Sequence, residues 1–284
     1  MHFSNRTNLP DVIRKAVLND GYDGHKKSDI TVSTLIAPPQ INVLRKKFRD
    51  FIVVDVEDRL YSLFGSAIHK VFEQAGESSN KDIIEERFYA MINGMSLSGQ
   101  VDRLIPSENK ISDWKFTGVN KIIYSNFEDW EKQLNCYAYL ARLNGYQIEK
   151  LEVIAVLRNW ERMKVKTQQN YPESMIQIVE IPVWADQKIQ AFIEKRIELH
   201  QNARAGTIAP CTEEEKWTKD HIWALMKKGR KTAVKLFKNK RDIPSVLEKE
   251  QFIQFRKGES LRCENYCDVK DFCPQYDKEK QDGK

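Results

Sequence analysis

Apolar residues recur every three to four positions along several stretches of the chain, and that period predicts amphipathic helices. The clearest stretch is 57–76, whose apolar positions are typical of a buried helix. A short helix is predicted to begin near Pro10, another to run from 130 to 143 and end before Gly145, and a long one to cover 185–205. Helices are therefore expected throughout the first 205 residues.

Strand patterns lie between these helices. Residues 83–92 and 98–115 predict three consecutive strands, the last two of which form a hairpin around a polar turn. The run 151–157 is almost continuously apolar, as in a strand covered on both faces, whereas 174–183 alternates like a half-exposed strand. This order of elements predicts an α/β core over residues 1–205, with a mixed central β-sheet flanked by helices.

The hairpin carries a candidate catalytic group. Side chains alternate across a strand, so Asp113 and Lys115 project from one face, while Asp102 lies on the partner strand. Two carboxylates and one ammonium could converge there, which is the minimum for a divalent-metal site that cleaves a phosphodiester. The triplet alone is weak support, because 31% of all residues are charged.

Two of the predicted helices offer further polar side chains. His69 and Glu73 are four residues apart and share a helix face, and so do Gln133 and Tyr137. A lone histidine beside an apolar stripe is commonly structural, and the second pair is also compatible with an ordinary helix that has a polar edge. Gly65, one turn before His69, would allow another backbone to approach that face closely.

Composition adds limits rather than a function. The 284 residues are 41% hydrophobic, with a formal charge of +5 and a pI of about 8.8, so an anionic partner is plausible but not required. No apolar run is long enough for a membrane span, and no charged-then-apolar leader opens the sequence. We therefore expect a soluble, cytoplasmic protein with no membrane partner.

A basic segment follows the predicted core. Residues 216–241 hold ten lysines or arginines against the single acid Asp220, a local net charge of about +9. The pattern predicts a hairpin with Gly229 in its turn, which either contacts a DNA backbone or is a solvated basic face. Trp217 and Trp223 could stack on an unpaired base, although core packing is the commoner role. The candidate DNA-binding residues crowd the tip of the hairpin: Lys227, Lys228, Arg230 and Lys231.

Four motifs in a fixed order resemble those of the PD-(D/E)XK nucleases, and within them the RecB-like, Cas4-like branch that includes phage exonucleases. Each motif is weak alone, but all four fall on the expected elements. They are Gly65-x-x-x-His69-x-x-x-Glu73, Gly99-x-x-Asp102, Asp113-x-Lys115 and Gln133-x-x-x-Tyr137. The resemblance covers roughly residues 30–145 and implies a restriction-endonuclease-like core.

The resemblance also implies a metal site and an activity. His69, Asp102, Asp113 and the backbone carbonyl of Trp114 would bind one or two Mg²⁺ or Mn²⁺ ions, which oxygen-rich ligand sets favour over zinc. Val101 stands where the family name has proline, at a position that varies widely in the group. The implied activity is a Mg²⁺- or Mn²⁺-dependent deoxyribonuclease, an exonuclease in DNA recombination, repair or phage DNA metabolism.

The remaining motif residues have implied positioning roles. Lys115 would contact the attacking water or the scissile phosphate, Gln133 and Tyr137 would position Lys115 and the DNA strand, and Glu73 would orient His69 or a water. The implied partner is DNA, at single- or double-stranded ends, in a bacterial host if the chain is phage-encoded. A recombination or replication protein and oligomer formation are compatible with it. A catalytically silent DNA-binding module, an endonuclease and an RNA nuclease stay open.

Three of the five cysteines lie close together near the C-terminus, which indicates a metal cluster more than a disulfide framework. Cys263, Cys267 and Cys273 resemble the C-terminal triplet of iron–sulfur members of the same group. Relatives place the fourth ligand upstream of the core, but no cysteine precedes Cys136 here. Cys211 is therefore the candidate fourth ligand of a [4Fe–4S] cluster, and Cys136 is expected to be a buried small side chain.

Structural zinc on the same four cysteines is the alternative to iron and sulfide. In either case the cluster would join the basic hairpin in a Cys-rich appendage, residues 206–284, packed on the core.

Overall fold

The protein, described here by a computed structural model, divides into two compact units. The first comprises residues 1–39 and 53–208, and the second comprises 40–52 and 209–284. The sequence predicts a division after residue 205 and leaves 40–52 in the first part, whereas the structure groups this segment with the C-terminal part. The described residues are 2–19, 27–76 and 81–282.

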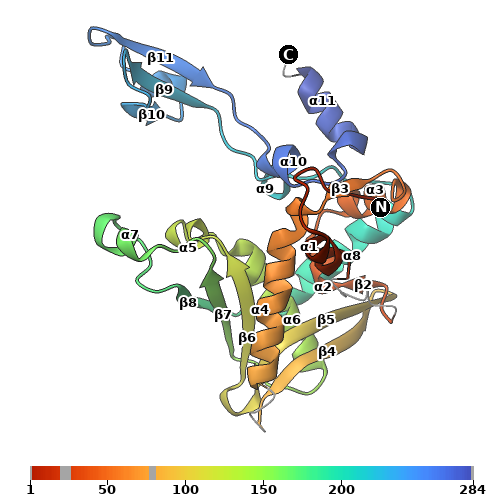
Figure 1. Ribbon diagram of the computed structural model, residues 1–284. Helices are drawn as coiled ribbons and strands as arrows, with labels where there is room; N and C mark the ends of the chain where they lie inside the picture. Colours follow the sequence, from red (N-terminus) through yellow and green to blue (C-terminus); the bar gives the residue numbers. More distant parts are fainter. Residues whose placement is uncertain (1, 20–26, 77–80, 283–284) are drawn as a thin grey trace. The chain divides into compact units, whose positions relative to one another are not determined.

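A six-stranded mixed sheet forms the centre of the first unit (Figure 1). The strand order is β2-β5-β6-β7-β8, and β4 pairs with β5. The pairs β2–β5 and β6–β7 are parallel, and the pairs β4–β5, β5–β6 and β7–β8 are antiparallel. This arrangement confirms the predicted α/β core. The strands are β2 (Ile30–Thr31), β4 (Ile83–Ile92), β5 (Met95–Ile105), β6 (Lys110–Thr117), β7 (Lys150–Leu157) and β8 (Ile176–Ile181).

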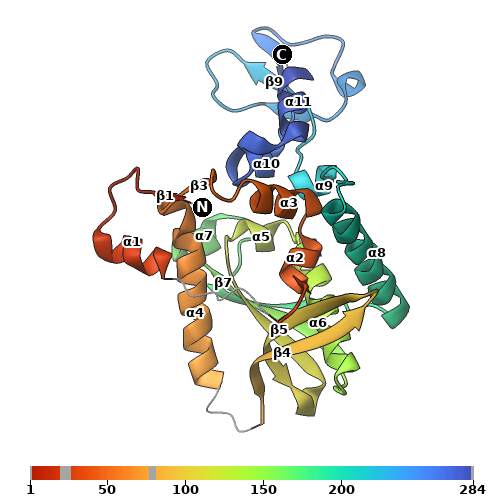
Figure 2. The same ribbon diagram turned by 90° about the vertical axis from the view of Figure 1, so that its right-hand side faces the viewer.

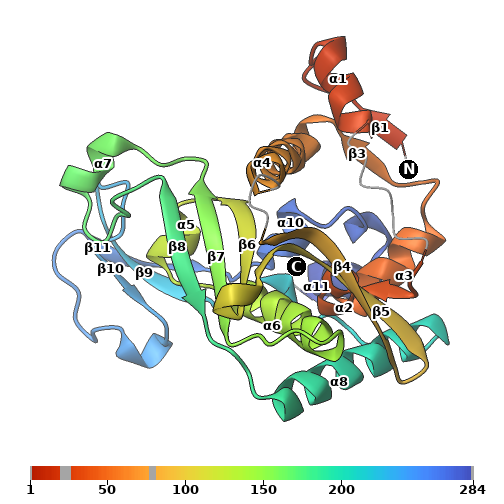
Figure 3. The ribbon, with the colours of Figure 1, turned by 90° about the horizontal axis from the view of Figure 1, so that it is seen from below.

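Helices cover both faces of this sheet. Figure 3 shows α4 on one face and α6, with α8 beyond it, on the other. The short α2 packs against α6 and α8 (Figure 2). The helices of this unit are α1 (Asp11–Leu18), α2 (Val32–Ile36), α4 (Leu60–Gly76), α5 (Asn120–Ile123), α6 (Glu128–Leu143), α7 (Arg162–Thr167) and α8 (Asp186–Arg204). They confirm the helices predicted near residue 10 and at 57–76, 130–143 and 185–205. A separate parallel pair, β1 (His2–Ser4) with β3 (Val53–Asp55), completes the unit.

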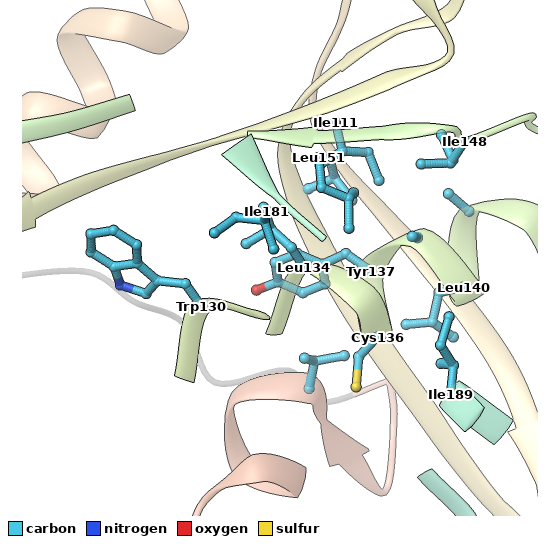
Figure 4. Close-up of a cluster of buried hydrophobic side chains, with 14 of the residues drawn as sticks. Ile111, Trp130, Leu134, Cys136, Tyr137, Leu140, Ile148, Leu151, Ile181 and Ile189 are labelled. Carbon is cyan, nitrogen blue, oxygen red and sulfur yellow. The ribbon is translucent and has the colours of Figure 1, made fainter. Parts of the chain in front are cut away.

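The core of the first unit lies between α6 and the sheet (Figure 4). Leu134 and Leu140 on α6 belong to the same buried cluster as Ile111 of β6 and Leu151 of β7, and Trp130 lies at its edge. Each fully buried side chain of this size contributes about 1.5–3 kcal/mol. α8 closes the core with isoleucines at every fourth position, which places them on one helix face: Ile189, Ile193 and Ile197.

Three expectations are corrected by the packing. α4 has the predicted period, but it is not buried, and its Phe64 and Val71 are 48% and 60% exposed. β7 is not covered completely on both faces, because Ile154 and Val156 are only half-buried. Gly65 does not receive a neighbouring backbone, since no atom lies within 4 Å of the place where a Cβ would stand.

The second unit joins α3 (Pro39–Lys47) to the C-terminal segment. Arg45 Nε donates to Asp268 Oδ2 at 2.8 Å, and Phe48 stacks on Phe272 with ring centroids 4.6 Å apart. A three-stranded antiparallel sheet, in the order β10-β9-β11, confirms the predicted basic hairpin and adds a third strand to it. The further elements are α9 (Glu213–Lys216), β9 (Ile222–Lys227), β10 (Lys235–Phe237), β11 (Gln251–Arg256), α10 (Leu261–Asn265) and α11 (Pro274–Asp282). In the part of the chain that the structure describes, no helix has the length and apolar character needed to cross a membrane.

Candidate active site

The candidate active site lies where β5 and β6 separate. Their last ladder pair at this end joins Arg103 to Ser112. At the next position the carboxylate of Asp102 accepts a hydrogen bond from the backbone N–H of Trp114 at 2.7 Å. The Asp102 side chain thus accepts from the Trp114 N–H, which in a continued ladder would donate to the backbone of the neighbouring strand. The break leaves the carboxylates of Asp102 and Asp113 on adjacent strands at the opening.

Asp113 and Lys115 occupy alternate positions of β6, as the sequence predicts. The Lys115 ammonium contacts Oδ2 of Asp113, and that buried oxygen receives no well-directed hydrogen bond from the described residues. Burial lowers the pKa of Lys115, but the charges of Asp113 and Asp102 outweigh this effect and raise it. Lys115 is therefore a cation at neutral pH, beside the carboxyl groups of Asp102 and Asp113.

α4 brings His69 to the same place. Its Nδ1 lies 3.6 Å from Oδ2 of Asp102 and 4.0 Å from Oε1 of Glu85. Within the described ranges, His69, Glu85 and Asp102 are the one group of candidate ligands whose atoms all lie within 4.8 Å of one another. The carboxylate beside His69 is thus Glu85 rather than the predicted Glu73, which forms an ion pair with Lys70 at 2.8 Å.

Glu85 is the site residue that the sequence motifs missed. It lies across from Asp102 on β4, between two paired positions of the β4–β5 ladder, and its φ of +54° is uncommon for a residue other than glycine. Gln100 Nε2 donates to Oε2 of Glu85 at 2.6 Å and holds the carboxylate in place. Counting back along the β4–β5 hairpin from its turn would have placed Glu85 opposite Asp102, but hydrophobic periodicity does not.

The electrostatics of the site favour a divalent cation. Burial and the charge of Asp113 raise the pKa of Asp102 to about 7, against the opposing effects of Lys115, His69 and the Trp114 N–H. Side-chain exposure rises from 1% at Asp113 through 11% at Asp102 to 33% at His69, so the site opens to solvent on the α4 side. A divalent cation would relieve the repulsion between the Asp102 and Asp113 carboxylates. The oxygen-rich donor set fits a hard ion such as Mg²⁺ or Mn²⁺.

Gln133 and Tyr137 lie one turn apart on α6. The Gln133 amide donates to the Tyr137 hydroxyl at 2.8 Å. Tyr137 packs directly on Gly99, where a Cβ would stand only 2.7 Å from the tyrosine ring. Gly99 precedes Asp102 by three residues, so Tyr137 supports the strand that carries this carboxylate. Direct positioning of Lys115 by the pair stays a prediction.

The second unit contains a separate cavity to which α3, α9, α10 and α11 all contribute. Gln40 on α3 donates to Cys273 Sγ at 3.2 Å and accepts from Cys211 Sγ at 3.7 Å. Burial raises the pKa of the Cys211 thiol to about 12 and that of Cys263 to about 11. Cys136 lies instead in the core of the first unit, fully buried. The cysteines that line the cavity are the four predicted ones: Cys211, Cys263, Cys267 and Cys273.

The predicted DNA-binding residues sit around the β9–β10 turn, where Gly229 adopts a φ of +81°. None of the four forms an ion pair with an acidic side chain in the described ranges. Trp217 is half-exposed with its ring against Tyr266, and Trp223 is half-buried. The four residues are Lys227, Lys228, Arg230 and Lys231. Their contact with DNA stays a prediction.

A mixed α/β sheet whose opened hairpin presents two carboxylates, a lysine and a nearby histidine defines a nuclease-type site. The family described as the PD-(D/E)XK nuclease superfamily matches residues 45–274, well over half of the chain. The chain belongs to this superfamily.

One solved structure agrees at the level of the fold. The crystal structure of SSO0001 is 16% identical, covers 73% of this chain and 91% of its own, and superimposes with a TM-score of 0.51. A protein from Eubacterium rectale named "Putative exonuclease" is 13% identical, covers 52% of this chain and 56% of its own, and has a TM-score of 0.35. No curated protein matches the sequence at a significant level.

Proposed function

We propose that this protein is a Mg²⁺- or Mn²⁺-dependent DNA nuclease, acting as an intracellular exonuclease in DNA recombination, repair or phage DNA metabolism. The observation that carries the proposal is the convergence of His69, Asp102, Asp113 and Lys115 where β5 and β6 separate. The choice of an exonuclease rests on the resemblance of the motifs to the RecB-like branch.

The proposed chemistry divides the work among these residues. His69, Asp102, Asp113 and the carbonyl of Trp114 would hold the metal, which when bound activates a water and stabilises the charge on the phosphate. Lys115, held by Asp113, would contact the attacking water or a phosphate oxygen and stabilise the negative charge that develops. The opening beside His69 would admit the DNA strand.

The runner-up is a catalytically silent DNA-binding module of the same fold. The contact between the Asp113 and Lys115 side chains argues against it, because a binding module has no chemical need for a buried carboxylate–ammonium pair beside a second carboxylate. A nuclease that acts on RNA, or inside a DNA strand, would use the same residues.

The test is to incubate the protein with end-labelled linear and closed circular DNA, each single- and double-stranded, and with RNA, in Mg²⁺ or Mn²⁺. Asp113→Ala is the inactive control. Degradation of linear DNA by the wild type alone supports the exonuclease. Cleavage of circles indicates an endonuclease, cleavage of RNA alone an RNA nuclease, and binding without cleavage the silent module.

We also propose that the four cysteines of the second unit hold a [4Fe–4S] cluster. The proposal rests on the resemblance of the Cys263, Cys267 and Cys273 triplet to that of iron–sulfur members of the group, and it is supported by the common cavity that the four cysteines line. Gln40 hydrogen-bonds to two of the sulfurs. A single zinc ion with Zn–S bonds of about 2.3 Å would bring its sulfurs within about 4 Å of one another. No three of the thiols in the described chain are as close as 4.8 Å. Zinc on the same four cysteines is the alternative, and the metal analysis below distinguishes the two.

This second proposal is tested on protein purified without oxygen, by measuring iron, sulfide and zinc per chain together with the visible absorption spectrum. We expect about four irons per chain and a brown chromophore, both lost in Cys267→Ser. Cys136→Ser is the matched control, since it removes a cysteine outside the cavity and should keep the iron. One zinc and no iron would establish the alternative.

A further inference from the structure

We infer that one face of the β9–β10–β11 sheet binds single-stranded DNA by stacking its bases. This inference deepens the proposed function, on which it rests, by naming an unpaired strand as the substrate. The face in question, called the aromatic face below, is defined by the rings of His221, Trp223 and Phe255.

The three rings form one continuous group. Trp223 and Phe255 are register partners across β9 and β11, and their ring centroids lie 5.3 Å apart. The His221 ring lies 5.5 Å from Phe255, and its Nδ1 accepts the backbone N–H of Gly258 at 2.9 Å, which fixes its orientation. Phe255 is nevertheless 54% exposed. An ordered ring left half in water is suited to stack on a flat partner.

Basic side chains continue the aromatic face toward the turn. Because side chains alternate, Trp223 shares its face of β9 with Lys227, four residues or about 13 Å further along. Lys235 lies on the same face from β10, where its ammonium sits 5.2 Å from the centroid of the Phe237 ring. Neither lysine has an acidic partner in the described part of the chain. Between the rings and the lysines this face carries Leu225 and Phe237, which are buried. A strand on this face would therefore meet the exposed Phe255 ring at one end and ammonium groups at the other.

The charge of the whole sheet selects the occupant. Residues 222–257 carry eleven lysines or arginines against three acids, so an anionic partner is favoured over an apolar protein surface. A duplex offers phosphates to the lysines, but its bases already stack on one another. Only an unpaired strand can use both the rings and the lysines, and base–aromatic stacking is tolerant of sequence.

The opposite face of the same strand provides a matched control. Phe252 on β11 is 49% exposed, close to the value for Phe255, but it lies three residues away and therefore on the other side of the sheet. Phe255→Leu keeps an apolar side chain and removes the ring, so it tests stacking without emptying the position. Phe252→Leu makes the same change on the opposite face.

The experiment measures binding of a fluorescein-labelled 15-nucleotide thymidine strand, and of a duplex of equal length, by fluorescence anisotropy in a Lys115→Ala background. We expect Phe255→Leu to bind the single strand roughly 5- to 100-fold more weakly, with the duplex changed less than about twofold. Phe252→Leu should bind both as the parent does. Quenching of tryptophan fluorescence by the strand, absent in Trp223→Phe, is the second expected result.

Three results would overturn the inference: unchanged single-strand affinity in Phe255→Leu, an equal loss in both leucine variants with unchanged melting temperatures, or preferential binding of the duplex. Tighter binding of an RNA strand would replace DNA as the occupant. A protein that binds the thymidine strand through Phe255 but cuts no DNA would refute the proposed nuclease and leave the aromatic face standing. If the wild type cuts DNA but Phe255→Leu binds the single strand as the parent does, the nuclease proposal stands and the inference about the aromatic face is refuted.

Discussion

Glu85 occupies a backbone conformation that few glutamates adopt, and it lies beside the two residues most suited to bind a metal. Strained conformations of this kind persist where the surrounding structure holds them, and they gather at functional sites. The amide of Gln100 donates a hydrogen bond to the Glu85 carboxylate. The side chains of His69 and Asp102 lie close to it. We therefore expect Glu85 to support metal binding.

Glu85→Gln should weaken Mn²⁺ binding by about 10- to 100-fold, because it removes one negative charge and keeps the size of the side chain. Isothermal titration of the metal in the absence of DNA measures this directly. Glu73→Gln is the control, since Glu73 pairs with Lys70, and should change the affinity less than about twofold. A larger loss in the Glu73 variant would restore the role that the motif implied.

Metal affinity should rise with pH up to about pH 7. Binding must displace the proton of Asp102, whose pKa is about 7 in the folded protein against 3.8 in the unfolded chain, and must compete with a His69 whose pKa is also raised. Each displaced proton weakens binding up to about tenfold per pH unit below that pKa. Titrations of Mn²⁺ at pH 5.5, 6.5 and 8 check this prediction, and a flat profile contradicts it.

The same carboxylate links pH to stability in the metal-free protein. Between about pH 4 and 7 the folded state holds a proton on Asp102 that the unfolded chain releases, so this group makes the protein less stable as pH rises through that window. Added Mg²⁺ should therefore raise the melting temperature more at pH 8 than at pH 5.5, and Asp102→Asn should reduce that difference.

The sequence predicted the placement of Asp102, Asp113 and Lys115, because this placement depends only on strand alternation and one hairpin. It did not predict the position of Glu85, because hydrophobic periodicity alone does not give the register of the β4–β5 hairpin. It also favoured Glu73 as the carboxylate that assists His69, because the two residues share a helix face. That spacing does not show which carboxylate lies beside His69, and in the structure this carboxylate belongs to Glu85 on the sheet.

At the scale of elements, the contact between α6 and β5 fixes the strand that carries Asp102. Gly99 leaves room for the Tyr137 ring, and a methyl group there would stand 2.7 Å from one ring carbon and 3.0 Å from Leu140. Real side chains do not approach this closely, so α6 or β5 must shift if Gly99 is replaced.

Gly99→Ala should destabilise the protein by about 1–3 kcal/mol, the usual cost of overpacking a core. Gly65→Ala is an opposite control on α4: with open space around it, a helical alanine should stabilise by about 0.5–1 kcal/mol. Urea unfolding of both variants gives the two values. If both variants changed the free energy of unfolding by the same amount and in the same direction, the close contact between α6 and β5 at Gly99 would not explain the effect of Gly99→Ala.

Element positions were predicted well because most helices and strands here have clear periods. Burial was predicted less well. α4 has the spacing of a core helix yet exposes Phe64 and Val71, because periodicity identifies an apolar face but not whether another element covers it.

At the scale of the whole chain, the second unit depends on residues that are distant in sequence. Arg45 and Asp268 are 223 positions apart, and no local pattern indicates their contact. This explains why the sequence predicted four ligand cysteines but left α3 out of their surroundings.

Loss of the proposed cluster should loosen the second unit selectively. In Cys267→Ser, backbone amides of α3, α10 and α11 should exchange hydrogen faster, while those of β5, β6 and β7 keep their protection, because the cysteines lie in one unit and the sheet in the other. Hydrogen exchange followed by mass spectrometry measures both regions in one sample. Uniform loss of protection would show that the two units unfold together.

The bond between Gln40 and Cys273 spans 233 positions, and this has a consequence for the newborn chain. A ribosome that adds about 5–20 residues per second needs roughly ten seconds to most of a minute to travel that distance. By the end of this interval every residue of the six-stranded sheet has been translated, whereas Ile41 and Leu44 of α3 have until then lacked the segment against which they are finally buried. Maturation therefore has a direction: the six-stranded sheet can assemble first, and the cysteine cavity closes only after Cys273 has been translated.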